Sequence, residues 1–371
     1  MKIAFVLDDS LDNPDGVQQY VIGLGEQFSK LGHEIYYLVG ETKRQDIPNV
    51  YPLSKNMRIN FNGNVVGTPM PANKLQIRQL LDRLNIDVLH VQMPYSPLLA
   101  GRVIKAASNG TAIVGTFHIF PNTSFESTMN KLLKLINRRT LKRFDHIVAV
   151  SGAAAKTAGL INQSRLSIIP NHVDLKKYRE AAVNDKAPGS LIFLGRLVAR
   201  KGCQLLLSAI AMLKHQGRLP AGVRLTVAGD GPQRKKLENF VNEQKLNSVV
   251  TFQGFVTELQ KAVLLGSAEI AVFPSTGGES FGIVLLEAMA GGAVILAGKN
   301  PGYAEVMDYS KQQLFNPYDP NELADKLEAL ISSRSRRQEF RLKQSDKVED
   351  FDIRNIAVRV EAVYKAALHS K

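Results

Sequence analysis

The amino-acid sequence predicts an α/β protein built from two doubly wound parallel-sheet domains. Short apolar runs typical of buried strands alternate along the chain with longer stretches of helical periodicity. Such alternation favours a parallel sheet that is covered by helices on both faces. A chain of 371 residues is too long for one sheet domain of this kind and suits two. Because ligands bind outside the carboxyl ends of the strands in such sheets, we expect both domains to face a central cleft.

The amino-terminal domain is expected at residues 1–173. It begins with a buried strand at 2–7, which is too short for the core of a signal peptide. A turn-rich loop that contains Pro14 and Gly16 follows, and then a helix at 17–31 that ends at a glycine. The elements predicted after these are strands at 34–39, 87–91, 112–117, 146–150 and 167–169, and a helix at 74–84.

The carboxyl-terminal domain is expected at residues 190–351. It follows a polar segment at 174–189 that has no clear periodicity and therefore predicts a linker. The predicted strands of this domain lie at 191–194, 224–228, 249–253 and 270–273, and its first helices at 204–214 and 234–243. A last helix, at about 352–371, is expected to pack back on the first domain.

The composition and the charge narrow the class of protein. A content of 44% hydrophobic and 22% charged residues is typical of a globular chain and excludes a disordered one. The single cysteine, Cys203, permits no internal disulfide, and no apolar run reaches the roughly 20 residues of a membrane-spanning helix, so we expect a cytoplasmic protein. The net charge of +13 attracts nucleic acid, anionic membranes or phosphorylated small molecules. The sequence has neither C2H2 spacing nor an RNP-type motif, so nucleic acid is not an expected partner.

The clearest functional signal follows the strand predicted at 270–273. Two glycines precede Glu279 and Ser280, and a helix is expected to begin near Ser280, whose hydroxyl is a favoured N-cap. The first backbone amides of such a helix have no partner within it, and they lie at the positive end of the helix dipole. Three of them, around Gly282, Ile283 and Val284, are therefore expected to form an anion site suited to a diphosphate.

Two carboxylates stand on either side of this expected anion site. Glu279 lies just before the helix, and Glu287 lies about two turns along it, roughly 10 Å further on. A glycosidase pair would face one bond across about 5 to 9.5 Å, whereas here the anion site lies between the two groups. Both side chains therefore suit hydroxyl binding, one to a sugar and the other to a ribose, better than acid catalysis.

Together with other motifs, this pair resembles the E-x7-E motif of the family 4 glycosyltransferases, which are retaining enzymes of the GT-B fold. The other matching stretches are Pro14-Asp15-Gly16-Val17-Gln18, Gly115-Thr116-Phe117-His118, 169–174, Phe193-Leu194-Gly195-Arg196, Lys201-Gly202 and 227–232. The likeness covers most of the chain and implies two Rossmann-like domains. Within the family, the layout is most similar to the phosphatidylinositol mannosyltransferases that use GDP-mannose.

The resemblance implies a role for each matching residue. Arg196 and Lys201 would hold the donor diphosphate, and their charges would stabilise the leaving group as the sugar–phosphate bond breaks. The implied catalytic residues are His118, Arg196, Lys201 and Glu279. The implied donor-binding residues are Gly16, Arg196, Lys201, Gly229, Phe255, Val256, Glu279, Phe281, Gly282, Ile283, Val284 and Glu287. Those implied to lie near the acceptor are Asp9, Asn62 and His118.

The resemblance implies no metal cofactor, because the basic pair would take the place of a metal ion. It leaves open a magnesium ion that accompanies the nucleotide diphosphate. Two positions depart from the family pattern. Asp15 stands where the family has the first of two glycines, and Asp8-Asp9 stand where the phosphatidylinositol mannosyltransferases have Pro-Tyr. The second departure leaves the head group of the acceptor open.

A basic stretch at 129–144 predicts an interfacial helix. Its apolar residues share one helical face, and six basic residues accompany them without an acidic one. Arg138, Arg139, Lys142 and Arg143 are therefore expected to contact an anionic membrane surface. The alternative is an ordinary amphipathic helix that covers the sheet and exposes its lysines to water.

These observations predict an enzyme that moves a hexose from a nucleotide-sugar donor to a lipid or glycolipid acceptor. The preferred form is transfer of mannose from GDP-mannose to an acceptor such as phosphatidylinositol, at the inner face of the plasma membrane. One alternative is a UDP-sugar enzyme of the same family with another glycolipid or a soluble acceptor, and another is a non-catalytic polyanion-binding protein. A dehydrogenase is disfavoured, because Gly229-x-Gly231 lacks the third glycine of a dinucleotide fingerprint.

Overall fold

The computed structural model divides the chain into two compact units. Unit 1 comprises residues 1–171 and 353–371, and unit 2 comprises residues 172–352. The structure describes all residues except 13–14, 62–63, 71, 93–97, 119–137 and 159–164. The segment predicted as a linker, 174–189, lies within unit 2, where its first residues form the short helix α7 (Leu175–Glu180). This helix is too short to show a period, although its residues Leu175 and Tyr178 are buried.

Unit 1 contains a parallel sheet whose strand order is β3-β2-β1-β6-β7-β8-β9. The order reverses at β1, which pairs in register with β2 on one side and with β6 on the other. The strands are β1 (Lys2–Leu7), β2 (Glu34–Val39), β3 (Val50–Pro52), β6 (Val88–Gln92), β7 (Ala112–Phe117), β8 (His146–Ala149) and β9 (Leu166–Ile168). An antiparallel pair, β4 (Asn56–Phe61) and β5 (Asn64–Pro69), forms a separate sheet that the sequence did not indicate.

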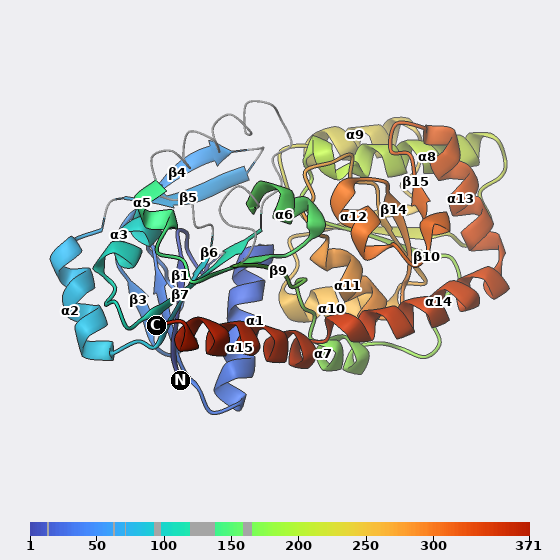
Figure 1. The fold of residues 1–371 in the computed structure, drawn as a ribbon. Helices are drawn as coiled ribbons and strands as arrows, with labels where there is room; N and C mark the ends of the chain where they lie inside the picture. The colour runs from blue at the N-terminus through green and yellow to red at the C-terminus, as the bar shows by residue number, and fades with distance from the viewer. Residues whose placement is uncertain (13–14, 62–63, 71, 93–97, 119–137, 159–164) are drawn as a thin grey trace. The chain divides into compact units, whose positions relative to one another are not determined.

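The described helices of unit 1 include the last helix of the chain, which packs against the first. They are α1 (Gly16–Lys30), α2 (Lys74–Leu84), α3 (Leu99–Ala106), α5 (Arg138–Leu141), α6 (Gly152–Ala158) and α15 (Ile353–His369). Figure 1 shows α15 beside α1, and the rings of Phe28 and Tyr364 lie 5.4 Å apart between these two helices. Apolar residues of α15 are thereby buried in the same core as β1, which holds the end of the chain on this unit.

Unit 2 contains a second parallel sheet, with the strand order β12-β11-β10-β13-β14-β15. Its strands are β10 (Ser190–Leu194), β11 (Arg224–Ala228), β12 (Val250–Gly254), β13 (Ile270–Phe273), β14 (Val294–Gly298) and β15 (Leu314–Phe315). The order reverses between β10 and β13, and such a reversal leaves a crevice at the carboxyl ends of the two strands. The two sheets thus confirm the predicted α/β class.

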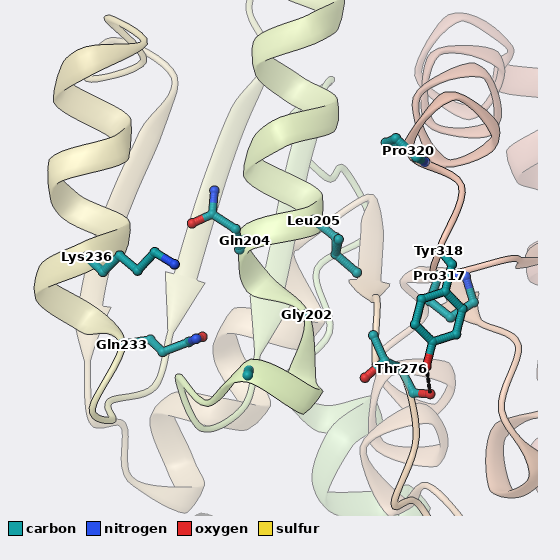
Figure 2. A pocket seen from close by; sticks show the side chains of 10 residues that line it. Gly202, Gln204, Leu205, Gln233, Lys236, Thr276, Pro317, Tyr318 and Pro320 are labelled. Atoms are coloured by element: carbon teal, nitrogen blue, oxygen red, sulfur yellow. Dashed lines mark hydrogen bonds between the residues drawn. The ribbon is translucent and has the colours of Figure 1, made fainter.

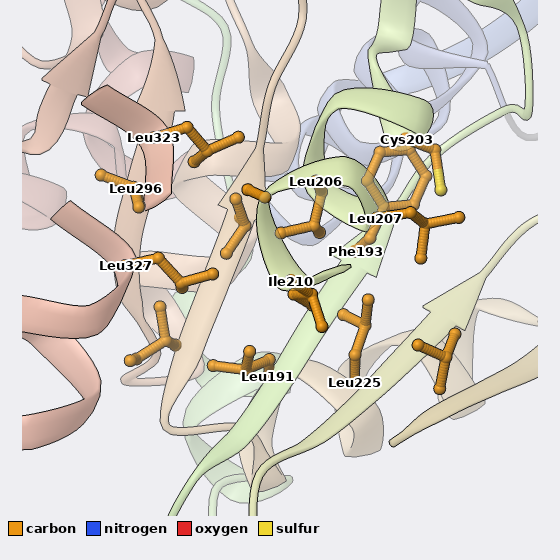
Figure 3. Close-up of a cluster of buried hydrophobic side chains, with 14 of the residues drawn as sticks. Leu191, Phe193, Cys203, Leu206, Leu207, Ile210, Leu225, Leu296, Leu323 and Leu327 are labelled. Carbon is orange, nitrogen blue, oxygen red and sulfur yellow. The ribbon is translucent and has the colours of Figure 1, made fainter. Parts of the chain in front are cut away.

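The helices of unit 2 cover both faces of this sheet. Besides α7, they are η2 (Ala199–Lys201), α8 (Cys203–His215), α9 (Arg234–Glu243), α10 (Glu258–Ser267), α11 (Ile283–Ala290), α12 (Pro301–Val306), η3 (Lys311–Gln313), α13 (Pro320–Ser332), α14 (Arg334–Val348) and η4 (Glu349–Phe351). Figure 3 shows side chains of α8, α13 and the sheet packed together, among them Leu206, Leu225 and Leu327. Cys203 lies in this cluster, and burial raises the pKa of its thiol to about 12, so the thiol stays protonated.

Candidate active site

The carboxyl edge of the sheet in unit 2 brings together three loops that carry predicted donor residues. These loops follow β10, β11 and β13, and backbone hydrogen bonds join them. The amide of Leu197 donates to the carbonyl of Asp230 at 2.9 Å, and the amide of Thr276 donates to the carbonyl of Arg200 at 2.9 Å. The loops after β10 and β13 flank the point where the strand order reverses, which is where ligands bind in such sheets.

Glycines permit the close packing of these loops. Gly229 has a φ of +132°, and a Cβ atom there would overlap the carbonyl oxygen of Gly195. Gly202 has a φ of +72°, and a Cβ atom there would overlap the carbonyl oxygen of Pro274. Any other residue would strain the backbone and push the loops apart. Gly229 therefore has a packing role in this edge, whatever else it contacts.

Glu279 is the centre of a charged cluster at this edge. Its side chain is only 11% exposed, and its Oε1 lies 2.8 Å from Nζ of Lys201 and 2.9 Å from Nη1 of Arg200. The hydroxyl of Ser275 also donates to Oε1, at 2.9 Å. Burial alone raises the pKa of this carboxyl group, but Lys201 and Arg200 more than offset that effect and hold the pKa below its ordinary value. Glu279 is therefore an ionised hydrogen-bond acceptor.

Arg200 is a residue of this cluster that the sequence reasoning missed. The sequence indicated Arg196 and Lys201 as the cationic pair, and the structure places Lys201 and Arg200 on Glu279. The signal was present as the adjacent pair Arg200-Lys201, which forms most of η2. Arg196 is half-buried in the same loop, two residues beyond the end of β10. Three cations thus belong to one loop of the edge.

The helix after Glu279 begins later than the sequence indicated. Its first residue is Ile283 and its N-cap is Gly282, which has a φ of +118° and makes no side-chain cap. The prediction of Ser280 as N-cap is therefore wrong, because the left-handed turn at Gly282 separates the preceding residues from the helix. The amides of Ile283 and Val284 still begin the helix without partners inside it. The side chain of Phe281 is buried against Phe351, with ring centroids 5.8 Å apart, so its ring is part of the packing of unit 2.

Glu287 lies just over one helical turn into α11 and is buried. The hydroxyl of Tyr178 donates to its Oε1 at 2.8 Å, and Nζ of Lys261 contacts the same oxygen. The two other predicted donor residues of unit 2 follow β12. Phe255 exposes 67% of its surface and Val256 is half-buried. An exposed ring at the carboxyl end of a strand is available for stacking on a base.

A hollow of about 410 Å³ lies beside these loops (Figure 2). Gly202 and Thr276 line it together with Gln204, Gln233, Lys236 and Tyr318. Its walls come from η2, from the first turns of α8 and α9, and from the segment before α13. None of the predicted donor residues is among those that line it, so the hollow adjoins the charged cluster without containing it.

The carboxyl edge of the sheet in unit 1 carries the residues predicted near the acceptor. His118 follows β7 and is buried, and its Nε2 donates to Oε1 of Gln92 at 2.7 Å. The edge of the His118 ring faces the ring of Tyr20, with centroids 4.9 Å apart. Asp9 follows β1 and accepts from the amide of Ser10 at 2.7 Å and from Nε2 of Gln18 at 3.1 Å. Gly16 is the exposed first residue of α1. Gln92 and Gln18 are contacts that the sequence reasoning did not find.

His90 has a structural role in unit 1. Its two ring nitrogens lie 2.6 Å from the hydroxyls of Tyr364 and Thr116. Burial lowers the pKa of the ring to about 3, so it is neutral at physiological pH. This neutral ring joins α15 to β7 beneath the edge that holds His118.

The residues expected at a membrane are only partly covered by the structure. Arg138 and Arg139 lie in α5, but their side chains lie outside the described part, as does Asn62 of the acceptor set. Lys142 is exposed. Arg143 is half-buried, and its guanidinium donates to the carbonyls of Ile104, Ala107 and Ser108 at the end of α3, the last two at 3.0 and 3.1 Å. Arg143 is thus a capping residue for α3.

The part of the chain that the structure describes offers neither a clustered set of metal ligands nor a membrane-spanning helix. Nowhere in that part do three His, Cys, Asp or Glu side chains gather as they do around a bound metal ion. Over the same residues, every helix falls short of the length and apolarity needed to cross a bilayer.

Comparisons with known proteins relate both halves of the chain to one group of enzymes. Residues 14–177 match the family model "Glycosyltransferase Family 4", and residues 174–346 match the model "Glycosyl transferases group 1". The phosphatidyl-myo-inositol mannosyltransferase of Mycolicibacterium smegmatis is 29% identical over 98% of this chain and 94% of its own length. The phosphatidyl-myo-inositol mannosyltransferase of Propionibacterium freudenreichii is 26% identical over 99% of this chain and 95% of its own length.

Solved structures resemble the fold over the full chain. Anabaena Alr3699/HepE in complex with UDP has a TM-score of 0.77 and 18% identity, covering 99% of this chain and 100% of its own. Sucrose-phosphate synthase from Thermosynechococcus elongatus has a TM-score of 0.75 and 20% identity, covering 100% of both chains. Together with the two family models, which between them span most of the chain, these findings show that the protein is a GT-B glycosyltransferase and belongs to family 4.

Proposed function

We propose that this glycosyltransferase moves mannose from GDP-mannose to a phosphatidylinositol-type lipid, with retention of the anomeric configuration. The observation that carries the proposal is the half-buried cluster of Glu279, Lys201 and Arg200, which precedes the first turn of α11. The relatives named as phosphatidyl-myo-inositol mannosyltransferases support the choice of sugar and acceptor. The contacts at the edge of unit 2 support the use of a nucleoside diphosphate as leaving group.

The diphosphate would lie between the cations of the β10 loop and the free amides of α11. Lys201, Arg200 and the neighbouring Arg196 supply positive charge, and Ile283 and Val284 supply amide donors. Negative charge grows on the diphosphate as the bond from the sugar C1 to phosphate oxygen breaks. Cations that are already placed stabilise this charge more than they stabilise the bound donor, so they accelerate the chemical step.

Glu279 would orient the transferred sugar. Its Oε1 accepts from Lys201, Arg200 and Ser275, and among the described residues none donates to Oε2. Oε2 is therefore available to a sugar hydroxyl. Because the carboxyl group is ionised, it accepts a hydrogen bond and has no proton to give.

The proton of the acceptor hydroxyl would pass to the departing phosphate oxygen. The new bond from C1 to the acceptor oxygen then forms on the face from which the phosphate leaves, so the configuration is retained. This step needs no basic side chain. His118 donates to Gln92, and its role would be to position the transferred sugar at the edge of unit 1.

A screen of activated sugars tests the proposal. Hydrolysis and transfer are measured with GDP-, UDP- and ADP-sugars, with phosphatidylinositol vesicles as acceptor. We expect GDP-mannose to be turned over in preference to the others. A preference for a UDP-sugar would support the alternative of a UDP-sugar enzyme of the same family. Salt-sensitive DNA binding without turnover of any sugar would support a non-catalytic polyanion-binding protein.

In this proposal, basic side chains of the protein neutralise the leaving diphosphate, which is a role that a metal ion has in other enzymes. Transfer is therefore expected to continue in excess EDTA, with a change of less than about threefold, since Lys201 and Arg200 already neutralise the leaving group. A complete loss of transfer that magnesium restores would show that a divalent ion accompanies the diphosphate.

A further inference from the structure

Three helices of unit 2 meet at the second glutamate of the E-x7-E motif. Tyr178 lies on α7, Lys261 on α10 and Glu287 on α11. The hydroxyl of Tyr178 donates to Oε1 of Glu287 at 2.8 Å, and the ammonium group of Lys261 forms an ion pair with the same oxygen. Lys261 also lies 2.9 Å from Oε1 of Glu258, whose Oε2 pairs with Lys177 at 2.9 Å. The cluster therefore balances two carboxylates with two ammonium groups.

The protonation states in this cluster follow from the burial of its members. Burial lowers the pKa of Lys261, but Glu287 and Glu258 more than offset the effect and raise it above its ordinary value. Lys261 is therefore charged. Burial and the neighbouring Glu287 both raise the pKa of Tyr178, so its hydroxyl keeps its proton and remains a donor. Unpaired charges would be costly at such a buried place, which explains why every charge here has an opposite partner.

The two donors, Tyr178 and Lys261, hold one carboxylate oxygen of Glu287 and do not contact the other. Both Tyr178 and Lys261 contact Oε1, and among the described residues none donates to Oε2. A carboxylate held at one oxygen by two donors from different helices cannot rotate freely about its side-chain torsions. Its second oxygen then points in one direction, as a preorganised hydrogen-bond acceptor does.

We propose that Tyr178 is a positioning residue for the donor nucleotide: with Lys261 it holds Oε1 of Glu287, so that Oε2 accepts from a ribose hydroxyl. The proposal rests on the proposed function, because it requires a nucleoside diphosphate at this edge. Tyr178 acts through Glu287 and does not contact the donor itself. The segment predicted as a linker thereby supplies a residue that controls recognition of the ribose.

The test compares ribose with dideoxyribose in two variants. Binding of the nucleoside diphosphate that the donor screen selects, and of its 2′,3′-dideoxy form, is measured by calorimetry. The variant Tyr178→Phe removes only the hydroxyl that donates to Glu287. The control variant Tyr309→Phe removes a hydroxyl of the same unit whose hydrogen bond goes to the sulfur of Met307. Melting temperatures are recorded for both, so that loss of folding is recognised.

In Tyr178→Phe, we expect the preference for ribose over dideoxyribose to fall about fivefold, because one of the two bonds that orient the carboxylate is lost. The KM for the nucleotide sugar should rise by a similar factor with kcat within about twofold, as for a lost binding contact. Tyr309→Phe should keep the preference of the parent protein. An unchanged preference in Tyr178→Phe would overturn the proposal.

A second variant keeps the test valid if Tyr178→Phe is unstable. Glu287→Gln retains the size of the side chain and should lose the preference for ribose by itself. In the double variant, Tyr178→Phe should then cause no further loss, since both changes act through the same acceptor. If the loss of ribose preference in the double variant equalled the sum of the losses in the two single variants, the positioning role of Tyr178 would be rejected. Failure of the parent protein to bind either nucleotide would instead count against the proposed function.

Discussion

The two sheet edges that carry the predicted site differ in charge, although both lie at a reversal of strand order. In unit 2, Lys201 and Arg200 surround Glu279 and leave the edge with an excess of positive charge. In unit 1, the corresponding edge presents Asp9, Gln92 and His118, which are joined to their neighbours by hydrogen bonds. A cationic edge suits an anionic diphosphate, and an edge of hydrogen-bonding side chains suits hydroxyl groups. The same architecture thus presents two kinds of side-chain chemistry at its strand ends.

Removal of a cation from the edge of unit 2 should have the largest effect. In Lys201→Ala, we expect kcat to fall by about 10² to 10³, because a charge placed for the leaving diphosphate is lost. Steady-state kinetics with the preferred donor would measure it, and melting temperatures would show that the variant is folded under the assay conditions. Lys235→Ala, at an exposed position of α9, is the matched control and should keep full turnover. If Lys201→Ala kept a rate close to that of the parent, the positive charge at the edge of unit 2 would not contribute to the chemical step.

The neutral histidine beneath the edge of unit 1 should make this unit sensitive to acid. His90 has a pKa of about 3 in the folded protein, against 6.5 for an ordinary histidine. Between these two pH values the unfolded chain binds a proton at this residue and the folded chain does not. The free energy of unfolding should therefore decrease as the pH falls below 6.5, by about 1.4 kcal/mol for each pH unit from this group. Urea unfolding of the parent and of His90→Gln between pH 7 and pH 4 would measure it.

The expected difference between these two proteins is a flatter pH dependence in His90→Gln. His369→Gln, which changes an exposed histidine of α15, should keep the slope of the parent. If the parent and His90→Gln lost stability in parallel, the burial of a neutral ring would not explain the acid sensitivity of unit 1.

Substitutions of the adjacent residues Lys142 and Arg143 in unit 1 should have different effects, one on membrane binding and the other on stability. Lys142 is exposed, so Lys142→Ser should weaken binding to anionic vesicles by about fivefold, at about 1 kcal/mol per basic residue. Arg143 donates to three carbonyls at the end of α3, so Arg143→Ser should instead lower the free energy of unfolding by about 1–3 kcal/mol. Vesicle sedimentation and urea unfolding distinguish the two effects. Vesicle binding that neither change affects would reject the membrane prediction for this pair.

The sequence predicted the fold better than the contacts of the site. The strands at 2–7, 112–117 and 270–273 were located because buried parallel strands are continuous apolar runs. The helix α7 was missed because only Leu175 and Tyr178 mark its buried face. The contacts of Glu279 with Arg200, and of Glu287 with Tyr178, join residues 79 and 109 positions apart, which no local pattern reveals. The roles assigned to these site residues stay predictions.

The smallest expected effect is that of Glu279 protonation on the melting temperature, which tests whether the edge of unit 2 is positively charged. The cations beside this carboxyl group hold its pKa below the ordinary value of 4.5, so the folded state gains from the ionised form. That contribution is complete above pH 4.5 and is lost as the pH falls through the lower pKa of the folded protein. The parent and Glu279→Gln should therefore differ most in melting temperature near neutral pH, and the difference should shrink only below about pH 4.5. A difference that shrinks already between pH 7 and pH 5 would mean that the cations do not depress this pKa, and that the positive charge at the edge of unit 2 is weaker than the geometry indicates.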